Sequence, residues 1–115
     1  MSKTLEISRG FEGWFVTIID PSLEDEQQHW SDVCLGMYSV VLLAEACEAN
    51  VAGTRYLATC EKDEEDFIEV EFWGGNTALL SITSSYYDKA VTLKYVFNIR
   101  KRAIELRKLL KDTGE

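Results

Sequence analysis

The feature that most constrains the fold is the stretch EKDEEDFIEVEFW at residues 61–73, which begins as a run of acids and ends in strict alternation. Alternate side chains of an extended strand point to opposite faces, so Ile68, Val70 and Phe72 share one face. The opposite face carries two carboxylates and two aromatic side chains, namely Phe67, Glu69, Glu71 and Trp73. The stretch therefore predicts a strand with one core face and one face where acids and aromatics lie together.

Length and composition predict one folded domain over residues 1–115, since 46% of the residues are hydrophobic and 28% are charged. No apolar run reaches the roughly 18 residues that span a bilayer. The N-terminal residues, MSKTLEISRG, lack a hydrophobic signal region. We therefore expect a cytoplasmic protein that does not bind membranes.

The formal net charge of −8 is unevenly distributed along the chain. Residues 1–88 contain 17 acids and 4 Lys or Arg, a net charge of −13, whereas residues 89–115 contain 3 acids and 8 Lys or Arg, a net charge of +5. The acidic part would repel phosphates, which disfavours direct nucleic-acid binding. This charge distribution favours a basic protein partner, although acidity also keeps many proteins soluble.

Two alternating segments near the N-terminus predict an antiparallel hairpin. They are residues 3–9 and 14–20, and the glycines at positions 10 and 13 bracket a short turn between them. Pro21 should end the second strand, because it has no amide hydrogen for the ladder.

From Ser22, a candidate N-cap, the apolar spacing changes to three and four residues. This spacing predicts a buried helix that starts between residues 23 and 31 and ends at Asn50 or Gly53. The main alternative is a strand over residues 33–43, which are rich in β-branched side chains.

The rest of the chain predicts a meander of strands at residues 55–60, 67–73, 77–83 and 91–97. Gly-Gly-Asn at residues 74–76 is a strong hairpin turn, because these residues tolerate positive φ. From about Asn98 the spacing becomes helical, and the last strand can instead merge into this helix. The predicted class is α+β, a twisted antiparallel sheet of about six strands in the order ββαββββα with two helices packed on it.

Residues with catalytic potential are few. The single histidine, His29, lies among acids without a placed nucleophile, and such a residue more often lies at the surface. The glycines at 74–75 lie between two strands, which excludes a dinucleotide fingerprint. We expect no catalytic residue and no cofactor. The alternative is a small enzyme or ligand-binding domain that uses His29, Tyr86, Tyr87 and Asp88.

Patterns for metal binding are absent from the sequence as well. The acids at residues 63–66 are contiguous and lack the alternate spacing and the glycine of a calcium loop. The three cysteines, Cys34, Cys47 and Cys60, lack zinc or redox spacing. We expect no bound metal and three reduced, partly buried thiols.

Protein recognition accounts better for the acidic stretch. Acids steer a basic partner, and exposed aromatics such as Phe67, Trp73 and Trp30 supply anchoring area. The predicted partner-binding residues are Glu61, Asp63, Glu64, Glu65, Asp66, Phe67, Glu69, Glu71 and Trp73. The alternative is that a helix covers both faces of the strand and makes Phe67 and Trp73 core residues. The basic residues of the final helix should form a solvated face that also neutralises the acidic body.

In general character this small, acidic α+β chain resembles the immunity proteins that neutralise bacterial polymorphic or contact-dependent toxins. The resemblance rests on the segments GWFVTIIDP at residues 13–21 and EDFIEVEFW at residues 65–73. It implies tight one-to-one binding of a cationic toxin domain, often a nuclease, and no catalysis by this chain. The alternative is a nucleic-acid mimic, but mimicry needs acids in a long two-row array, and here they concentrate in one loop and strand.

Overall fold

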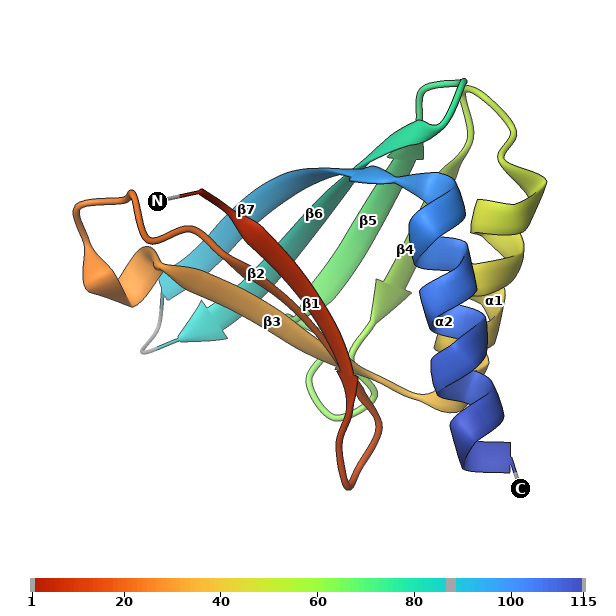
Figure 1. Ribbon diagram of the computed structural model, residues 1–115. Coiled ribbons are helices and arrows are strands. Elements are labelled where there is room, and N and C mark those ends of the chain that lie inside the picture. Colours follow the sequence, from red (N-terminus) through yellow and green to blue (C-terminus); the bar gives the residue numbers. More distant parts are fainter. Residues whose placement is uncertain (1, 87–88, 115) are drawn as a thin grey trace.

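The structure is a computed structural model that describes residues 2–86 and 89–114 (Figure 1). Within these residues the chain forms seven strands and two α-helices in the order βββαββββα. The strands are β1 (Thr4–Arg9), β2 (Trp14–Ile19), β3 (Trp30–Leu35), β4 (Arg55–Thr59), β5 (Phe67–Phe72), β6 (Thr77–Tyr86) and β7 (Lys89–Asn98). The helices are α1 (Met37–Ala49) and α2 (Ile99–Gly114), and a short 3-10 helix, η1 (Glu26–Gln28), precedes β3.

The strands form two antiparallel sheets rather than one. Strands β1, β2 and β3 make a three-stranded sheet in that order, and β4 to β7 make a four-stranded sheet in chain order. The α+β class is therefore confirmed, whereas a single sheet of about six strands in the order ββαββββα is wrong. The physical reason is an additional strand, β3, in a segment whose spacing predicts a helix.

The residues of β3 show how one apolar pattern can satisfy two periods. Val33 lies at helical spacing from Met37, but Ser31, Val33 and Leu35 also alternate, and all three are at most 2% exposed. The hairpin strand β2 has a second edge of backbone hydrogen-bonding groups, and β3 pairs with it along its whole length. Backbone pairing therefore favours the strand, and helix α1 begins only at Met37.

Helix α1 ends where the sequence predicts and begins later than expected. Asn50 takes a left-handed conformation with φ of 46°, and its N–H donates to the Ala46 carbonyl at 2.9 Å, which closes the last turn. Ser22 does not cap this helix, because its hydroxyl donates to Asp20 Oδ1 at 2.6 Å within the loop before η1. The buried face of α1 consists of Val40, Leu43, Ala44 and Cys47.

The remaining elements follow the predicted order. The β1–β2 hairpin forms, and Gly74 and Gly75 make the β5–β6 turn with φ of 101° and 64°, which glycine adopts without steric cost. Residues 91–97 belong to strand β7 and not to the final helix. Asn98 caps α2, since its Oδ1 accepts a hydrogen bond from the Lys101 N–H at 2.9 Å.

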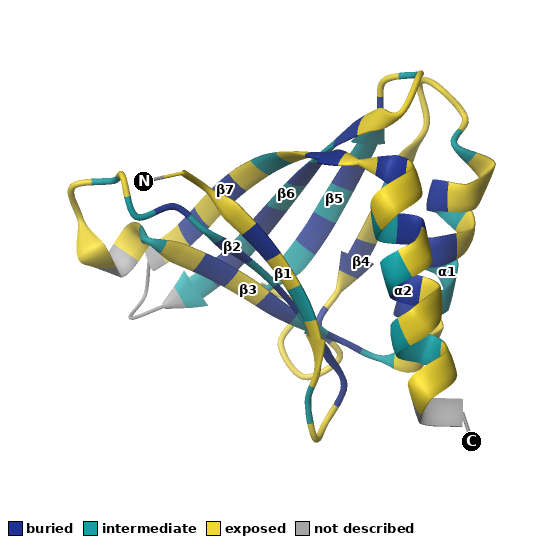
Figure 2. Ribbon diagram, viewed as in Figure 1, coloured by how far each residue is buried: buried dark blue, intermediate teal, exposed yellow. Residues whose placement is uncertain are grey.

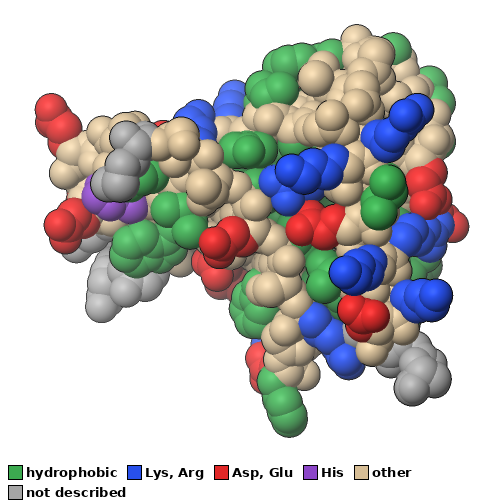
Figure 3. All heavy atoms as spheres, viewed as in Figure 1, with side chains coloured by type: hydrophobic (Ala, Val, Ile, Leu, Met, Phe, Trp, Pro, Cys, Tyr) green, Lys and Arg blue, Asp and Glu red, His purple; other side chains and the backbone are tan. Residues whose placement is uncertain are grey.

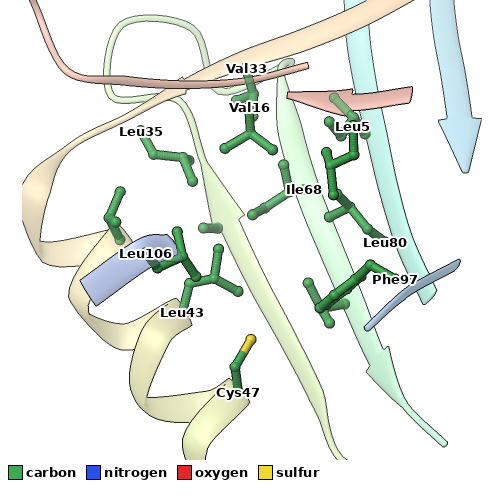
Figure 4. Packing of buried hydrophobic residues seen from close by; sticks show 14 of the residues in the cluster. Leu5, Val16, Val33, Leu35, Leu43, Cys47, Ile68, Leu80, Phe97 and Leu106 are labelled. Carbon is green, nitrogen blue, oxygen red and sulfur yellow. The ribbon is translucent and has the colours of Figure 1, made fainter. Parts of the chain in front are cut away.

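The two sheets and the two helices surround one hydrophobic core. In Figure 1 the three-stranded sheet crosses the four-stranded sheet, and α1 and α2 lie side by side at one edge. Figure 4 shows the core between the sheets and the helices. Strand β2 contributes Val16 to it, β5 contributes Ile68 and α2 contributes Leu106. Buried and less buried positions alternate along β2 and β5, as Figure 2 shows, so each strand turns one face inward.

A buried hydroxyl joins the two sheets where β3 meets β6 and β7. Ser31 Oγ lies 3.0 Å from the Ile82 carbonyl oxygen, 3.1 Å from the Val91 carbonyl oxygen and 2.8 Å from Ser84 Oγ. The Ser31 hydrogen can be shared between the two carbonyls while the Ser84 hydroxyl donates to Ser31. Because Ser31 and Ser84 are buried, these bonds satisfy polar groups that water does not reach.

Ser31→Ala should lower the free energy of unfolding by about 1–3 kcal/mol, because the Ser84 hydroxyl loses a buried partner. Ser81→Ala is the matched control, since Ser81 also lies on β6 but on its outer face. This control should change stability by less than about 0.5 kcal/mol. Urea unfolding followed by circular dichroism measures both variants, and equal stabilities would contradict a stabilising role for Ser31.

Candidate functional site

Strand β5 has the two-faced character that its sequence predicts. The inward residues are at most 2% exposed and belong to the core: Ile68, Val70 and Phe72. The outward residues are half-buried on the outer face of the four-stranded sheet: Phe67, Glu69 and Glu71. Trp73, directly after the strand, is 53% exposed. Trp73 is therefore a surface residue, and the alternative in which it belongs to the core is wrong.

The two outward carboxylates of β5 share one cation. Arg55 on the neighbouring strand β4 places its guanidinium nitrogens 3.3 Å from Glu69 Oε2 and 3.4 Å from Glu71 Oε1. The register allows this, because Arg55 lies directly opposite Glu71. The sequence alone does not reveal the pairing, since it does not show which strand lies beside β5. This part of the face is less negative than its acids alone predict, so it attracts a basic partner less strongly.

An open groove lies at the Trp73 end of this sheet face. Its volume is about 430 Å³, and it is lined by Gly53, Thr54, Arg55, Glu71, Phe72 and Trp73. On the same outer face, Leu57 of β4 and Val96 of β7 are large apolar side chains exposed to solvent. The face thus combines apolar area with a paired Arg and Glu, a composition found at protein interfaces.

The acidic loop, residues 61–66, lies at the other end of β5 from Trp73. A six-residue strand separates the two by about 20 Å. Phe67 adjoins the acidic loop, whereas Glu71 and Trp73 adjoin the groove. The structure therefore places the predicted partner-binding residues on two separate surfaces and not in one patch.

Two carboxylates of the acidic loop hold the loop in shape. Asp66 Oδ1 accepts the Ser85 N–H at 2.9 Å, and Asp63 Oδ1 accepts the Glu65 N–H at 3.0 Å. The Cys60 N–H also donates to the Asp66 carbonyl at 2.9 Å, which closes the base of the loop. Four acids of the loop are exposed to solvent, namely Glu61, Asp63, Glu64 and Glu65.

The tip of the β1–β2 hairpin lies beside the acidic loop. Lys62 Nζ is 2.6 Å from Glu12 Oε1, and Phe11, the neighbour of Glu12, is fully exposed. In Figure 1 the hairpin projects from the body at this end. Sequence reasoning missed Phe11, because two glycines mark a turn but nothing local shows that it projects. We call this region the acidic end surface and define it by Phe11, Glu12, Glu61, Asp63, Glu64 and Glu65.

The acidic loop also packs against the outer side of β3. Although Asp32 is exposed to solvent, nearby protein atoms desolvate its carboxyl, and this desolvation followed by the negative charge of Asp66 raises its pKa. Asp32 and Cys34 alternate with the core residue Val33, so both lie on the outer side of β3. Trp30 lies on that side too and is half exposed, but it belongs to the three-stranded sheet and not to the face that carries β5.

Of the candidates for a small-molecule site, the structure describes the side chain of His29. His29 Nε2 donates to the Leu23 carbonyl at 2.6 Å, which holds the ring within the loop before β3. Tyr87 and Asp88 lie outside the described residues, as does the side chain of Tyr86. Among the residues that the structure describes, no group of three or more His, Cys, Asp or Glu is placed to hold a metal ion.

The basic residues of α2 are partly paired within the molecule. Arg107 makes two hydrogen bonds of 2.8 Å to the Glu48 carboxylate on α1, and Arg102 lies 2.9 Å from Glu105. The hydrogen bond from Arg107 lowers the pKa of Glu48. Figure 3 shows Lys and Arg side chains gathered over α2 with acidic side chains between them. The Arg107–Glu48 pair neutralises part of the acidic body internally, whereas the Arg102–Glu105 pair lies within α2.

No helix in the described part of the chain is long and apolar enough to cross a membrane. Comparisons of the chain with protein-family models, curated proteins and solved structures found no match. The function is therefore inferred from the surfaces of the molecule itself, of which the acidic end surface and the outer sheet face are the two candidates.

Trp73→Ala should cost less than about 1.5 kcal/mol of unfolding free energy, because the side chain is only half-buried. Phe72→Ala, one residue away, should cost about 3–5 kcal/mol, because it leaves a cavity in the core. Chemical unfolding of the two variants measures the difference. Comparable losses would show that Trp73 packs in the core after all.

Asp32→Asn should raise the Tm at neutral pH. The pKa of Asp32 is raised in the folded state, so its stabilising contribution is complete below the unfolded pKa and is lost as the pH rises through the folded pKa. The gain from Asp32→Asn should therefore be larger at about pH 7 than at about pH 3. Glu64→Gln removes the same charge from an exposed position of the loop and is the control. Thermal unfolding at both pH values checks this, and equal gains for the two variants would contradict it.

Proposed function

We propose that this protein neutralises a cationic partner protein, as an immunity protein does when it inhibits its cognate bacterial toxin. The toxin domain, such as a nuclease, docks one-to-one on the acidic end surface. The observation that carries this proposal is a fully exposed aromatic residue, Phe11, beside the four exposed acids of the acidic loop at a projecting end of the molecule. These acids form one loop and not two rows, which favours contact with a protein over imitation of a nucleic acid.

Each part of the acidic end surface has a role in association. Exposed carboxylates create a negative potential that steers a basic partner toward the loop. Phe11 supplies a large apolar side chain with few rotatable bonds, as interface anchors do. Lys62, the one basic residue in this loop sequence, is held by Glu12, and that hydrogen bond raises the pKa of Lys62. The surface therefore presents its negative charge without an unpaired cation in the loop.

The outer sheet face is a second contact surface for the same partner. Its proposed contact residues are those of the strand, Phe67, Glu69, Glu71 and Trp73, beside the groove. Reversing the charges of Glu69 and Glu71 would place cations against Arg55. The repulsion would destabilise the fold, so a loss of binding could not be separated from a loss of stability. Charge reversals in the acidic loop test binding more cleanly, because Glu64 is exposed and takes part in none of the salt bridges between described residues.

Paired genetics in the native host tests the immunity function directly. Deletion of the gene for this protein should be tolerated only when the neighbouring toxin gene is deleted too. The product of that neighbour should co-purify with this protein in a one-to-one complex. Unrestricted deletion with every neighbouring gene intact would overturn the immunity function.

Glu64→Lys/Glu65→Lys should slow association with the co-purified toxin domain by about tenfold at low salt, because the steering charge changes sign. The salt dependence of the association rate should weaken in parallel. Glu24→Lys/Glu26→Lys is the matched control, since these exposed acids lie in the loop before β3, in a different part of the molecule (Figure 1). Stopped-flow measurements at low and high salt compare the two. If both double variants slow association equally, net charge is responsible and the acidic end surface is not the docking site.

A further inference from the structure

Two cysteines from different sheets line one small cavity beside the acidic loop. Cys34 is on the outer side of β3, and Cys60 directly follows β4. The cavity has a volume of about 90 Å³, and Glu12, Glu61 and Lys62 also line it. Cys34 is partly exposed, whereas Cys60 is 8% exposed. The third cysteine, in α1, is buried elsewhere in the core.

The register of β3 against the loop brings these two thiols together. Asp32 and Cys34 are two residues apart on the same side of β3. Asp66 acts electrostatically on Asp32, and Cys60 acts in the same way on Cys34. Within the loop, the backbone hydrogen bond of 2.9 Å from Cys60 N–H to the Asp66 carbonyl ties these two partners to each other. On the outer side of β3, Asp32 therefore lies near Asp66 of the loop, and Cys34 lies near Cys60.

We propose that Cys34 and Cys60 form an intramolecular disulfide when the protein is exposed to hydrogen peroxide. The more exposed Cys34 thiolate attacks a peroxide oxygen, the O–O bond breaks, and a sulfenic acid and the first water form. The Cys60 thiolate then attacks that sulfur, the S–S bond forms, and the sulfenic oxygen leaves as the second water. Two thiols lose two electrons and two protons in total, and one peroxide is reduced to two waters. The new bond joins β3 covalently to the base of the acidic loop.

The surroundings of the pair make this oxidation slow at neutral pH and faster in base. Burial raises the pKa of the Cys34 thiol, Cys60 and Glu12 raise it further, and Lys62 opposes them. The thiolate is the reactive form, so the rate should rise about tenfold per pH unit until the thiol ionises. Burial raises the pKa of Cys47 to about 12, so Cys47 should stay reduced.

Peptide mapping of the folded chain after treatment with hydrogen peroxide tests the pair. Cleavage after glutamate places each cysteine in its own peptide, with Cys34 in residues 27–45, Cys47 in residues 46–48 and Cys60 in residues 49–61. The expected product is peptide 27–45 linked to peptide 49–61, about 2 Da lighter than the two reduced peptides together. Free thiols should fall from three to one, and a reductant should restore them.

Three single variants give the controls. Cys34→Ser and Cys60→Ser should each abolish the cross-link, whereas Cys47→Ser should leave it in place. Circular dichroism of each reduced variant establishes that it is folded before oxidation. The proposal is overturned if Cys34 in the folded wild-type chain proceeds to a sulfinic acid while Cys60 stays a thiol. A disulfide that joins Cys47, or that joins two chains, overturns it as well.

Discussion

The pairing of β3 with β2 is the interaction on which most of the structure depends. It turns Val33 and Leu35 into the core and leaves Asp32 and Cys34 on the outer side, against the acidic loop. Because side chains alternate along a strand, one register fixes both faces, and a slip of one residue would exchange them. The same strand carries Ser31, whose hydroxyl reaches β6 and β7. The core, the junction of the sheets and the support of the acidic loop therefore follow from one ladder of backbone hydrogen bonds.

The acidic loop is fixed at its base and open at its surface. Asp66 and Cys60 are held by hydrogen bonds, while Glu64 and Glu65 are exposed. A loop that is already ordered loses less conformational entropy on docking, so more of the contact energy contributes to affinity. Gathering like charges in one loop has an electrostatic cost, and the ion pairs of α2 offset part of the overall acidity. The molecule thus tolerates a concentrated negative surface without being uniformly acidic.

Local patterns predicted the elements that depend only on neighbouring residues. The alternation of β5 was readable because its inward and outward side chains differ sharply, and Gly74 and Gly75 mark a turn that requires positive φ. Helix was predicted for the residues of β3, and a strand over residues 33–43 was only the alternative, because Val33 fits a helical period as well as a strand period; the structure has strand to Leu35 and helix from Met37. The neutralising role of Arg55 was missed because it depends on which strands pair, and no local pattern records strand order. The exposure of Phe11 was missed for a similar reason, since it depends on where the hairpin projects.

The sequence by itself determined the α+β class, the two-faced strand β5, the hairpin turns and an end of α1 at Asn50 or Gly53, of which the structure has Asn50. These features arise from side-chain periodicity and backbone preferences within a few residues. Only the tertiary structure decided that the strands divide into two sheets, that Trp73 lies at the surface, and that Cys34 and Cys60 line one cavity. Those outcomes depend on contacts between residues far apart in the chain, which form only when strand pairing and burial of the core are satisfied together.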